Sequence, residues 1–233
     1  MKRRAENEDV RAAARSSALL EGASEEALGE LAGLALCHDY PKNNILFYQD
    51  DPGGAAFLVL SGRVKIGLTN EEGREVVVGF VGTGGFLGLI PLLDGGPHPT
   101  NAITVTKSRL AKLEGQALLA WMERQKGTER RLLRELGCCA RRAYQKLSEH
   151  ALLSVKERLL SALLEIAEHE GERGSGGAGV VFTRPTHQEL ADRIGSSREV
   201  VSRILKELLE SDLLQAEGRV IRVPASALIL REE

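Results

Sequence analysis

Three things are scarce in this chain: aromatic residues, cysteines and long apolar runs. Aromatic residues make up 4% of its 233 residues, too few for a platform on which single-stranded bases stack. The cysteines, Cys37, Cys138 and Cys139, are an odd number without a Cys-x-x-Cys pair, so we expect reduced thiols rather than disulfides or a zinc site. No window of about 18 residues is apolar, and the arginine-rich start lacks the apolar segment of a secretory signal. We therefore expect a cytoplasmic protein without membrane contact.

An excess of charge of one sign is lacking as well. The formal net charge is −2, so the bulk charge does not indicate nucleic-acid binding. Residues 124–158 carry ten Lys or Arg against four Glu, whereas residues 184–223 carry seven basic and seven acidic residues. Non-specific phosphate binding by the second segment should be modest. If that segment binds DNA, specific contacts have to supply the affinity.

The most informative stretch runs from Pro185 to Leu209 and predicts a helix-turn-helix. Thr186 and Glu189 stand three apart and can cap a first helix reciprocally. Gly195 then permits the tight turn between two helices. The first helix presents an apolar stripe to its neighbour, made of Leu190, Ala191 and Ile194.

A second helix is predicted directly after this turn, because Ser196 and Glu199 repeat the capping pattern. At about 100° per residue, its apolar residues fall on one side, namely Val200, Val201, Ile204, Leu205 and Leu208. The opposite arc carries Arg198, Glu199, Ser202, Arg203 and Lys206. Arg can bond guanine and Glu can accept from cytosine in a major groove. The alternative is a solvated surface with a Glu199–Arg203 pair one turn apart.

A short hairpin with glycine at its turn is predicted after these helices, over residues 215–223. The segment from Gly195 to Lys206, followed by this wing, closely resembles the recognition motif of the cyclic AMP receptor and FNR (CRP/FNR) superfamily of bacterial transcription regulators. The resemblance implies a homodimer on a palindromic, TGTGA-like site in double-stranded DNA, with RNA polymerase as a partner. Arg198 and Arg203 would contact guanines and Glu199 a cytosine. The other implied DNA-binding residues are Thr186, His187, Ser197 and Ser202.

The N-terminal half changes from helical to β periodicity. Residues 1–17 are expected to be frayed, and a helix capped by Ser24 to follow over 24–34. Short strands are predicted at 45–48, 55–60, 63–68, 75–81 and 104–113, separated by glycine-rich turns, which is typical of a barrel or jelly roll. Tyr-Pro-Lys at 40–42 and Leu-Ser-Gly-Arg-Val-Lys at 60–65 look like the β-roll sensor domain of the same superfamily.

The resulting fold class is α+β in three parts. The resemblance implies a cyclic-nucleotide-binding-like β-roll over residues 18–122, a dimerisation helix over residues 123–153 and a winged helix-turn-helix over residues 154–233. A hinge is expected at 152–154 and a flexible loop at 171–179.

The resemblance implies a cyclic-nucleotide pocket with a Gly-Glu pair for the ribose and an Arg-Ser or Arg-Thr pair for the phosphate. Gly88 matches, but Leu89 replaces the Glu, and the Arg position falls on Pro99, or on Thr100 if the loop shifts by one. A buried phosphate without a cationic partner is costly, so tight cyclic AMP binding is not expected. Lys146 and Leu147 would approach the pocket from the long helix.

Other effectors of the superfamily find no better match. An iron–sulfur cluster needs several cysteines and only Cys37 lies in this half, and a haem ligand would be expected near Leu89. His98 is interpreted as an ordinary surface residue, so no metal site is predicted and the cofactor is left unknown. The effector stays open, and a regulator whose sensor is silent is a further alternative.

The helical region from 115 to 171, interrupted near Gly127, contains a seam with steps of three and four residues. Its members are Leu133, Leu136, Ala140, Ala143, Leu147 and His150. We predict that the seam forms a dimer; the alternative is packing on the β-roll.

A cupin-like enzyme is the competing function, because cupins also use a β-roll. A cupin metal site needs clustered His and Glu, whereas the five histidines are dispersed and no nucleophile–base group is apparent. We therefore predict a protein that is not an enzyme.

Overall fold

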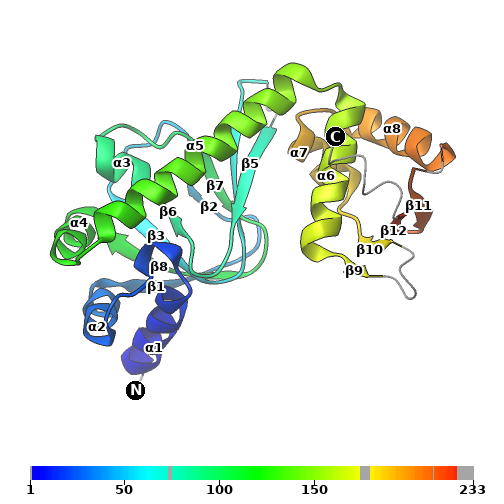
Figure 1. Cartoon of the computed structure of the whole chain (residues 1–233). Helices are drawn as coiled ribbons and strands as arrows, with labels where there is room; N and C mark the ends of the chain where they lie inside the picture. The colour runs from blue at the N-terminus through cyan, green and yellow to red at the C-terminus, as the bar shows by residue number, and fades with distance from the viewer. Residues whose placement is uncertain (1, 73–74, 174–178, 212, 225–233) are drawn as a thin grey trace. The chain divides into compact units, whose positions relative to one another are not determined.

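The computed structural model describes residues 2–72, 75–173, 179–211 and 213–224. The chain divides into two compact units (Figure 1). Unit 1 comprises residues 1–69 and 78–143, and unit 2 comprises residues 70–77 and 144–233.

Unit 1 begins with α1 (Lys2–Arg15), a short 3₁₀ turn at Ala18–Leu20, and α2 (Glu25–Leu34). The expectation of a frayed start was wrong for residues 2–17, the described part of the range 1–17. Val10, Ala13 and Ala14 are buried in the same cluster as the sheet residues, so tertiary packing stabilises a helix that is also rich in alanine. Arg109 adds an ion pair of 3.0 Å to Asp9. The predicted cap of α2 is confirmed, because Ser24 accepts a hydrogen bond from the Ala27 backbone N–H.

Two four-stranded sheets form the rest of the β-rich part. The first has the order β1-β8-β3-β6, made of Leu36–Tyr40, Ser108–Glu114, Ala55–Ser61 and Phe86–Leu87. The second has the order β2-β7-β4-β5, made of Ile45–Phe47, Asn101–Thr104, Val64–Thr69 and Glu75–Val81. The single strand predicted at 104–113 is two strands, β7 and β8, in different sheets. The Ser108 hydroxyl bonds the Thr106 carbonyl at 3.0 Å and so closes the turn between them.

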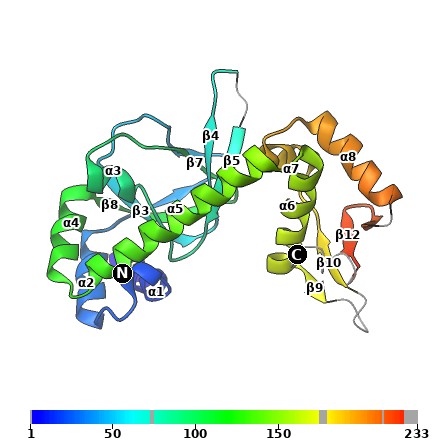
Figure 2. The same cartoon turned by 45° about the horizontal axis from the view of Figure 1, so that its top comes forward.

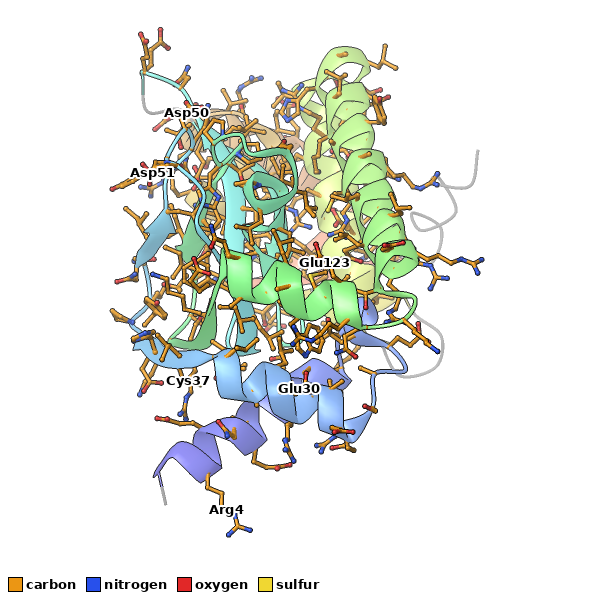
Figure 3. The ribbon with its side chains drawn as sticks, turned by 90° about the vertical axis from the view of Figure 1, so that its left-hand side faces the viewer. Arg4, Glu30, Cys37, Asp50, Asp51 and Glu123 are labelled. Atoms are coloured by element: carbon orange, nitrogen blue, oxygen red, sulfur yellow. The ribbon has the colours of Figure 1, made fainter. Side chains whose placement is uncertain are left out.

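The core of unit 1 lies where the helices cover the first sheet. Residues 56–60 of β3 are all buried, and Trp121 of α4 (Gly115–Arg124) is fully buried. Figure 3 labels Glu30 on α2 and Glu123 on α4 and shows these two helices side by side. Arg124 of α4 pairs with Glu30 at 3.6 Å. Helix α5 (Thr128–Leu152) follows after Gly127, whose φ of 76° confirms the predicted interruption.

In the described part of unit 2, helices α6, α7 and α8 follow the end of α5 and surround a small sheet (Figure 2). The elements are α6 (Val155–Glu170), α7 (His187–Ile194) and α8 (Arg198–Glu210), with β9 (Glu172–Arg173), β10 (Val180–Thr183), β11 (Gln215–Glu217) and β12 (Val220–Val223). The sheet order is β11-β12-β10-β9. Ser154 and Glu157 form a capping box that starts α6 after the break at the predicted hinge. The loop predicted at 171–179 begins as β9, and residues 174–178 lie outside the described residues.

One apolar cluster holds unit 2 together. It joins the inward faces of α6, α7 and α8 to Phe182, Ile221 and Val223 of the sheet. Leu159, Leu163, Leu190, Val201 and Leu208 have no exposed surface. The outward faces of α7 and α8 are therefore fixed by a well-packed core.

Candidate DNA-binding surface and effector pocket

The first helix of the helix-turn-helix is built as its sequence predicts. The Thr186 side chain accepts a hydrogen bond from the Glu189 N–H, and the Thr186 N–H donates to Glu189 Oε2 at 2.7 Å. The helix ends at Gly195, whose φ of 62° lies in the left-handed region that glycine adopts without strain. Leu190, Ala191 and Ile194 are buried, as expected.

The second helix begins one residue later than predicted. Ser197, not Ser196, is the N-cap of α8, and its Oγ accepts from the Val200 N–H at 3.3 Å. The Ser196 N–H instead donates to the Ala191 carbonyl at 2.9 Å. Ser196 therefore belongs to the turn that closes α7, and the cap passes to the next serine.

The exposed and buried sides of α8 agree with the predicted helical arcs. Val201, Ile204, Leu205 and Leu208 are buried, and Val200 packs partly against the same cluster. The residues of the predicted outer arc are all exposed, namely Arg198, Glu199, Ser202, Arg203 and Lys206. These five side chains present donors and acceptors from one face of a helix, the arrangement that suits a major groove.

The charges on α8 pair differently from the alternative considered above. Arg203 Nη1 lies 3.3 Å from Glu207 Oε1, toward the end of the helix, and Glu199 is not its partner. Hydrogen bonds from its own backbone N–H and from Ser197 lower the pKa of Glu199. The Glu199 carboxylate therefore stays ionised and accepts hydrogen bonds. Arg198 forms no ion pair with any residue that the structure describes.

His187 lies in the first turn of α7, half-buried. Burial lowers its pKa, and the charges of Arg184 and Arg198 lower it further. Its Nε2 is buried and has no hydrogen-bond partner among the described residues. Burial and the two charges both favour the neutral form of the imidazole.

The wing is the predicted hairpin. Strands β11 and β12 pair antiparallel, with Gly218 at a φ of 61° in the turn. Arg219 Nη2 donates to the Arg184 carbonyl at 3.1 Å, and the Arg184 N–H donates to the Arg219 carbonyl at 2.9 Å. These two bonds tie the wing to the segment that leads into α7.

Unit 1 contains a cavity of about 370 Å³ beside the N-terminal half of α5. Four of the predicted pocket residues line it, namely Gly88, Leu89, Pro99 and Thr100. Lys146 and Leu147 are not among the described residues that line this cavity, and Lys146 pairs with Glu149 at 2.7 Å. Their role at the pocket stays a prediction.

A short helix that the sequence analysis did not predict shapes one side of this cavity. Helix α3 runs from Leu89 to Asp94 and begins at Gly88, whose φ is 75°. A Cβ on Gly88 would lie 2.8 Å from the Ala55 carbonyl oxygen. Only glycine therefore fits where the chain turns from β6 into α3, and the turn brings Leu89 to the cavity.

The interpretation of His98 as a surface residue was wrong. Only 4% of His98 is exposed, and its ring stacks on Phe47 with the centroids 3.7 Å apart. The His98 N–H donates to the Asp51 carbonyl at 2.9 Å, and the Asp50 N–H donates to the His98 carbonyl at 2.8 Å. Burial lowers the pKa of His98, opposed by the charge of Asp51.

The cavity does not offer a cyclic nucleotide the partners that the resemblance implies. Leu89 and Pro99, to which the resemblance assigns the ribose and phosphate contacts, both line the cavity and have no polar side-chain group. The charged residues among the lining are Glu135 and Arg142, both on α5, whose charges oppose each other. The rest of the lining is dominated by aliphatic and aromatic side chains, including Ile66, Val78, Val81, Phe86, Ile90 and Leu132.

Helix α5 has two apolar stripes. Leu132, Leu136, Cys139 and Ala143 line the cavity. On another face, Leu133 is 69%, Tyr144 is 72% and Leu147 is 65% exposed, and Ala140 is exposed between them. The predicted seam is thus divided between the two faces. Cys138 and Cys139, like Cys37, are unbonded thiols, and burial raises the pKa of Cys37 and of Cys139.

No group of three His, Cys, Asp or Glu residues in the described ranges is placed to hold a metal ion. The same ranges contain no helix long and apolar enough to cross a membrane. A sheet-rich unit with a small cavity, joined to a unit with a winged helix-turn-helix, defines a DNA-binding protein with an attached sensor-type domain.

Comparison with known proteins agrees with this class. Residues 37–125 match the cyclic nucleotide-binding domain, and residues 157–228 match the Crp-like helix-turn-helix domain. The cyclic AMP receptor protein of Thermus thermophilus is 31% identical over 190 residues, which cover 82% of this chain and 84% of that protein. The chain therefore belongs to the CRP/FNR family of transcription regulators.

Other relatives cover nearly the whole chain. A CRP-like cAMP-activated global transcriptional regulator of Mycobacterium tuberculosis is 28% identical over 213 residues, 91% of this chain and 95% of that protein. The solved structure of CLP, the c-di-GMP-responsive global regulator of Xanthomonas campestris, has a TM-score of 0.74 at 26% identity and covers 87% of this chain and all of that one.

Proposed function

We propose that this protein is a homodimeric, sequence-specific regulator of transcription that binds a palindromic, TGTGA-like DNA site. The observation that carries the proposal is the exposed arc of α8, with Arg198, Glu199 and Arg203 held outward by a buried opposite face. Arg198 and Arg203 would each donate two hydrogen bonds to a guanine, and Glu199 would accept from a cytosine. Ser202, Ser197, Thr186 and His187 would add contacts around them.

The exposed stripe of α5 supports the homodimer. Leu133, Tyr144 and Leu147 are large apolar residues with about two-thirds of their surface exposed, and the small Ala140 between them allows close approach of a second helix. Spacings of seven, four and three residues suit a two-helix seam. Two recognition helices, related by a twofold axis, would enter major-groove turns about 34 Å apart.

We infer no catalytic role, and we expect the protein to work where the DNA is, in the cytoplasm, with RNA polymerase as a partner. The cavity of unit 1 is the proposed effector site. Two alternatives for regulation remain distinct: a ligand other than cyclic AMP, or a dimer that binds DNA without any ligand.

Selection of random duplex DNA by the purified protein, with and without cyclic AMP at fixed salt, tests the DNA-binding proposal. Enrichment of a palindrome without cyclic AMP would favour the dimer that binds DNA without a ligand, whereas enrichment only with cyclic AMP would contradict the expectation drawn from Leu89 and Pro99. Arg198→Ala should weaken binding to that palindrome by about 1–3 kcal/mol and relax one base position. Lys156→Ala is the control for charge, because it removes one positive charge from an exposed position on α6, outside the exposed arc of α8, and should leave the base preference unchanged. Uniform weakening across all sequences by Arg198→Ala would contradict base readout.

The dimer has its own test. Leu147→Glu should convert the protein to a monomer in sedimentation and reduce its affinity for the full palindrome much more than for a half-site. Leu36→Glu is the control, since Leu36 is 64% exposed on β1 and Leu147 is 65% exposed on α5. An unchanged sedimentation coefficient for Leu147→Glu would reject the seam.

A further inference from the structure

The last turn of α5 packs against the helix-turn-helix. Residues 144–152 of α5, residues 70–77 and the helix-turn-helix all belong to unit 2. A Cβ on Gly195, in the turn between α7 and α8, would lie 2.6 Å from Cε1 and 3.4 Å from Nδ1 of His150. It would also lie 3.4 Å from Cγ2 of Val76 on β5. Glycine at this position therefore leaves room for the imidazole, which packs directly against the turn.

Helix α6 holds the end of α5 in this place. Arg158 of α6 donates from Nη1 to the His150 carbonyl at 3.4 Å and to the Leu153 carbonyl at 3.3 Å. Carbonyl groups in the last turn of a helix lack partners within the helix, so the guanidinium satisfies acceptors that the end of α5 leaves open. The backbone at His150 is therefore tied to α6, whose inner face belongs to the core of unit 2.

The charges around His150 disfavour its protonated form. Burial lowers the pKa of His150, the charges of Arg158 and Lys146 lower it further, and Glu149 acts in the opposite direction. Lys146 Nζ lies 2.7 Å from Glu149 Oε2, so the effects of these two charges partly cancel. A positive charge on this half-buried ring would be desolvated and would lie near the guanidinium of Arg158, and both conditions are unfavourable.

The other elements at this contact also carry charged residues. They are Glu75 on β5, Arg193 on α7 and Arg198 on α8. Arg193 pairs with Glu165 of α6 at 2.9 Å, and Arg198 belongs to the exposed arc of α8. Among the neighbouring charges, Arg158 has the largest effect on His150. Protonation of the ring therefore acts against the contact with the turn.

From this geometry we propose that His150 is a positioning residue for DNA binding, whose neutral ring holds the turn between α7 and α8 in place and whose protonation releases that turn. The arc of α8 is exposed while the contact exists, so we assign the contact to the DNA-binding state. This role rests on the proposed function. A released histidine has an ordinary pKa near about 6.5, so the contact and the DNA affinity should weaken as the pH falls below that value.

The affinity for the selected palindrome is measured at pH 7.5 and pH 5.5 at fixed salt, and the ratio of the two values is compared between proteins. His150→Gln takes up no proton at this position. The unmodified protein should lose about two- to tenfold more affinity in acid than His150→Gln does, the upper value being the change in protonation over one pH unit below an ordinary pKa. Titrating groups common to both proteins, His187 among them, cancel in this comparison. His38→Gln is the control, because it removes an exposed histidine of β1 in unit 1 and should keep the ratio of the unmodified protein.

Two further variants separate charge from size. His150→Lys carries a positive charge at both pH values, and His150→Met has a side chain of similar length without charge. At pH 7.5 His150→Lys should bind the palindrome about two- to tenfold more weakly than His150→Met, the same range as for protonation. His150 is also the last residue of the predicted seam, so sedimentation of each variant is measured. A coefficient that shifts toward the monomer would assign His150 to the dimer and overturn the proposal.

A measurement without DNA follows the contact itself. In isotope-labelled protein, the nuclear Overhauser effect between His150 Hε1 and the Gly195 Hα protons should be present at pH 7.5 and weaken as the ring takes up its proton. Persistence of this effect after His150 has titrated would overturn the proposal. Equal pH ratios for the unmodified protein and His150→Gln would overturn it as well, while DNA binding itself stays intact. A contact that responds to pH in a protein that binds no palindrome at either pH would instead reject the proposed function.

Discussion

Units 1 and 2 differ in how closely their functional surfaces agree with what the family resemblance implies. In unit 2, residues 157–228 match the family's helix-turn-helix domain, and the core beneath α8 leaves the side chains of its opposite face exposed. In unit 1, residues 37–125 match the cyclic nucleotide-binding domain, but the cavity is lined mainly by apolar side chains, Leu89 and Pro99 among them. A fold is determined by its core and its turns. Which ligand it binds is determined by a few side chains, and these can vary without changing the fold.

The largest effect is expected from substitutions in the two cores, which test whether the two units unfold independently. Leu58 in unit 1 and Leu163 in unit 2 have no exposed surface and lie in different clusters. Replacing either by alanine removes buried methyl groups and leaves a cavity, which should lower the free energy of unfolding of its own unit by about 2–5 kcal/mol.

Calorimetry together with hydrogen exchange measures this effect for each unit. Leu58→Ala should lower the transition and the amide protection of unit 1 alone, and Leu163→Ala those of unit 2 alone. Equal loss of protection in both units for either variant would show one cooperative structure and would remove the basis of the comparison.

Sequence reasoning succeeded where local signals agree with each other. Thr186, Glu189 and Gly195 specify the start and end of α7 through caps and a turn, and the apolar spacing of α8 specifies its buried face. The interruption at Gly127 is of the same kind. In each case the deciding interactions lie within a few residues along the chain, so a single sequence contains them.

The errors fall where the deciding partner is distant in sequence. His98 is buried because Phe47 lies under it, and α1 is ordered because Val10 packs into a cluster built from the sheet and Arg109 pairs with Asp9. The stripes of α5 show another limit. Residues three and four apart can be grouped into more than one stripe, and only the position of the sheets decides which one lines the cavity.

A smaller loss of stability is expected when the helix caps of the two units are removed. Ser24 caps α2 through one hydrogen bond of 3.1 Å to the Ala27 N–H, whereas Thr186 takes part in a reciprocal box with Glu189. Ser24→Ala should destabilise unit 1 by about 0.5–1 kcal/mol and Thr186→Ala should destabilise unit 2 by about 1–2 kcal/mol. The midpoint of urea unfolding for each unit measures the difference. A larger loss for Ser24→Ala would show that the box adds nothing to the single cap.

The smallest expected effect is the pH dependence of stability that His98 and His187 cause, since the pKa values of both are lowered. The folded protein holds a proton on His98 or His187 less tightly than the unfolded chain does, for which a pKa near about 6.5 is ordinary. Between the lowered and the ordinary pKa the unfolded state binds more protons, so stability decreases as the pH falls below about 6.5. His98→Phe should reduce this loss in unit 1, and His187→Gln should reduce it in unit 2.

The salt dependence of stability distinguishes burial from neighbouring charges as the cause of the lowered histidine pKa values. Burial is the leading cause for both residues, but Arg184 and Arg198 contribute only at His187, whereas the charge of Asp51 acts in the opposite direction at His98. Salt screens charges and leaves desolvation in place, so raising NaCl from 50 to 500 mM should weaken the acid sensitivity that His187 confers on unit 2. The contribution of His98, obtained by subtracting the His98→Phe profile, should persist or grow as Asp51 is screened. Equal salt dependence of both contributions in urea unfolding at pH 5 and pH 7 would contradict this assignment of causes.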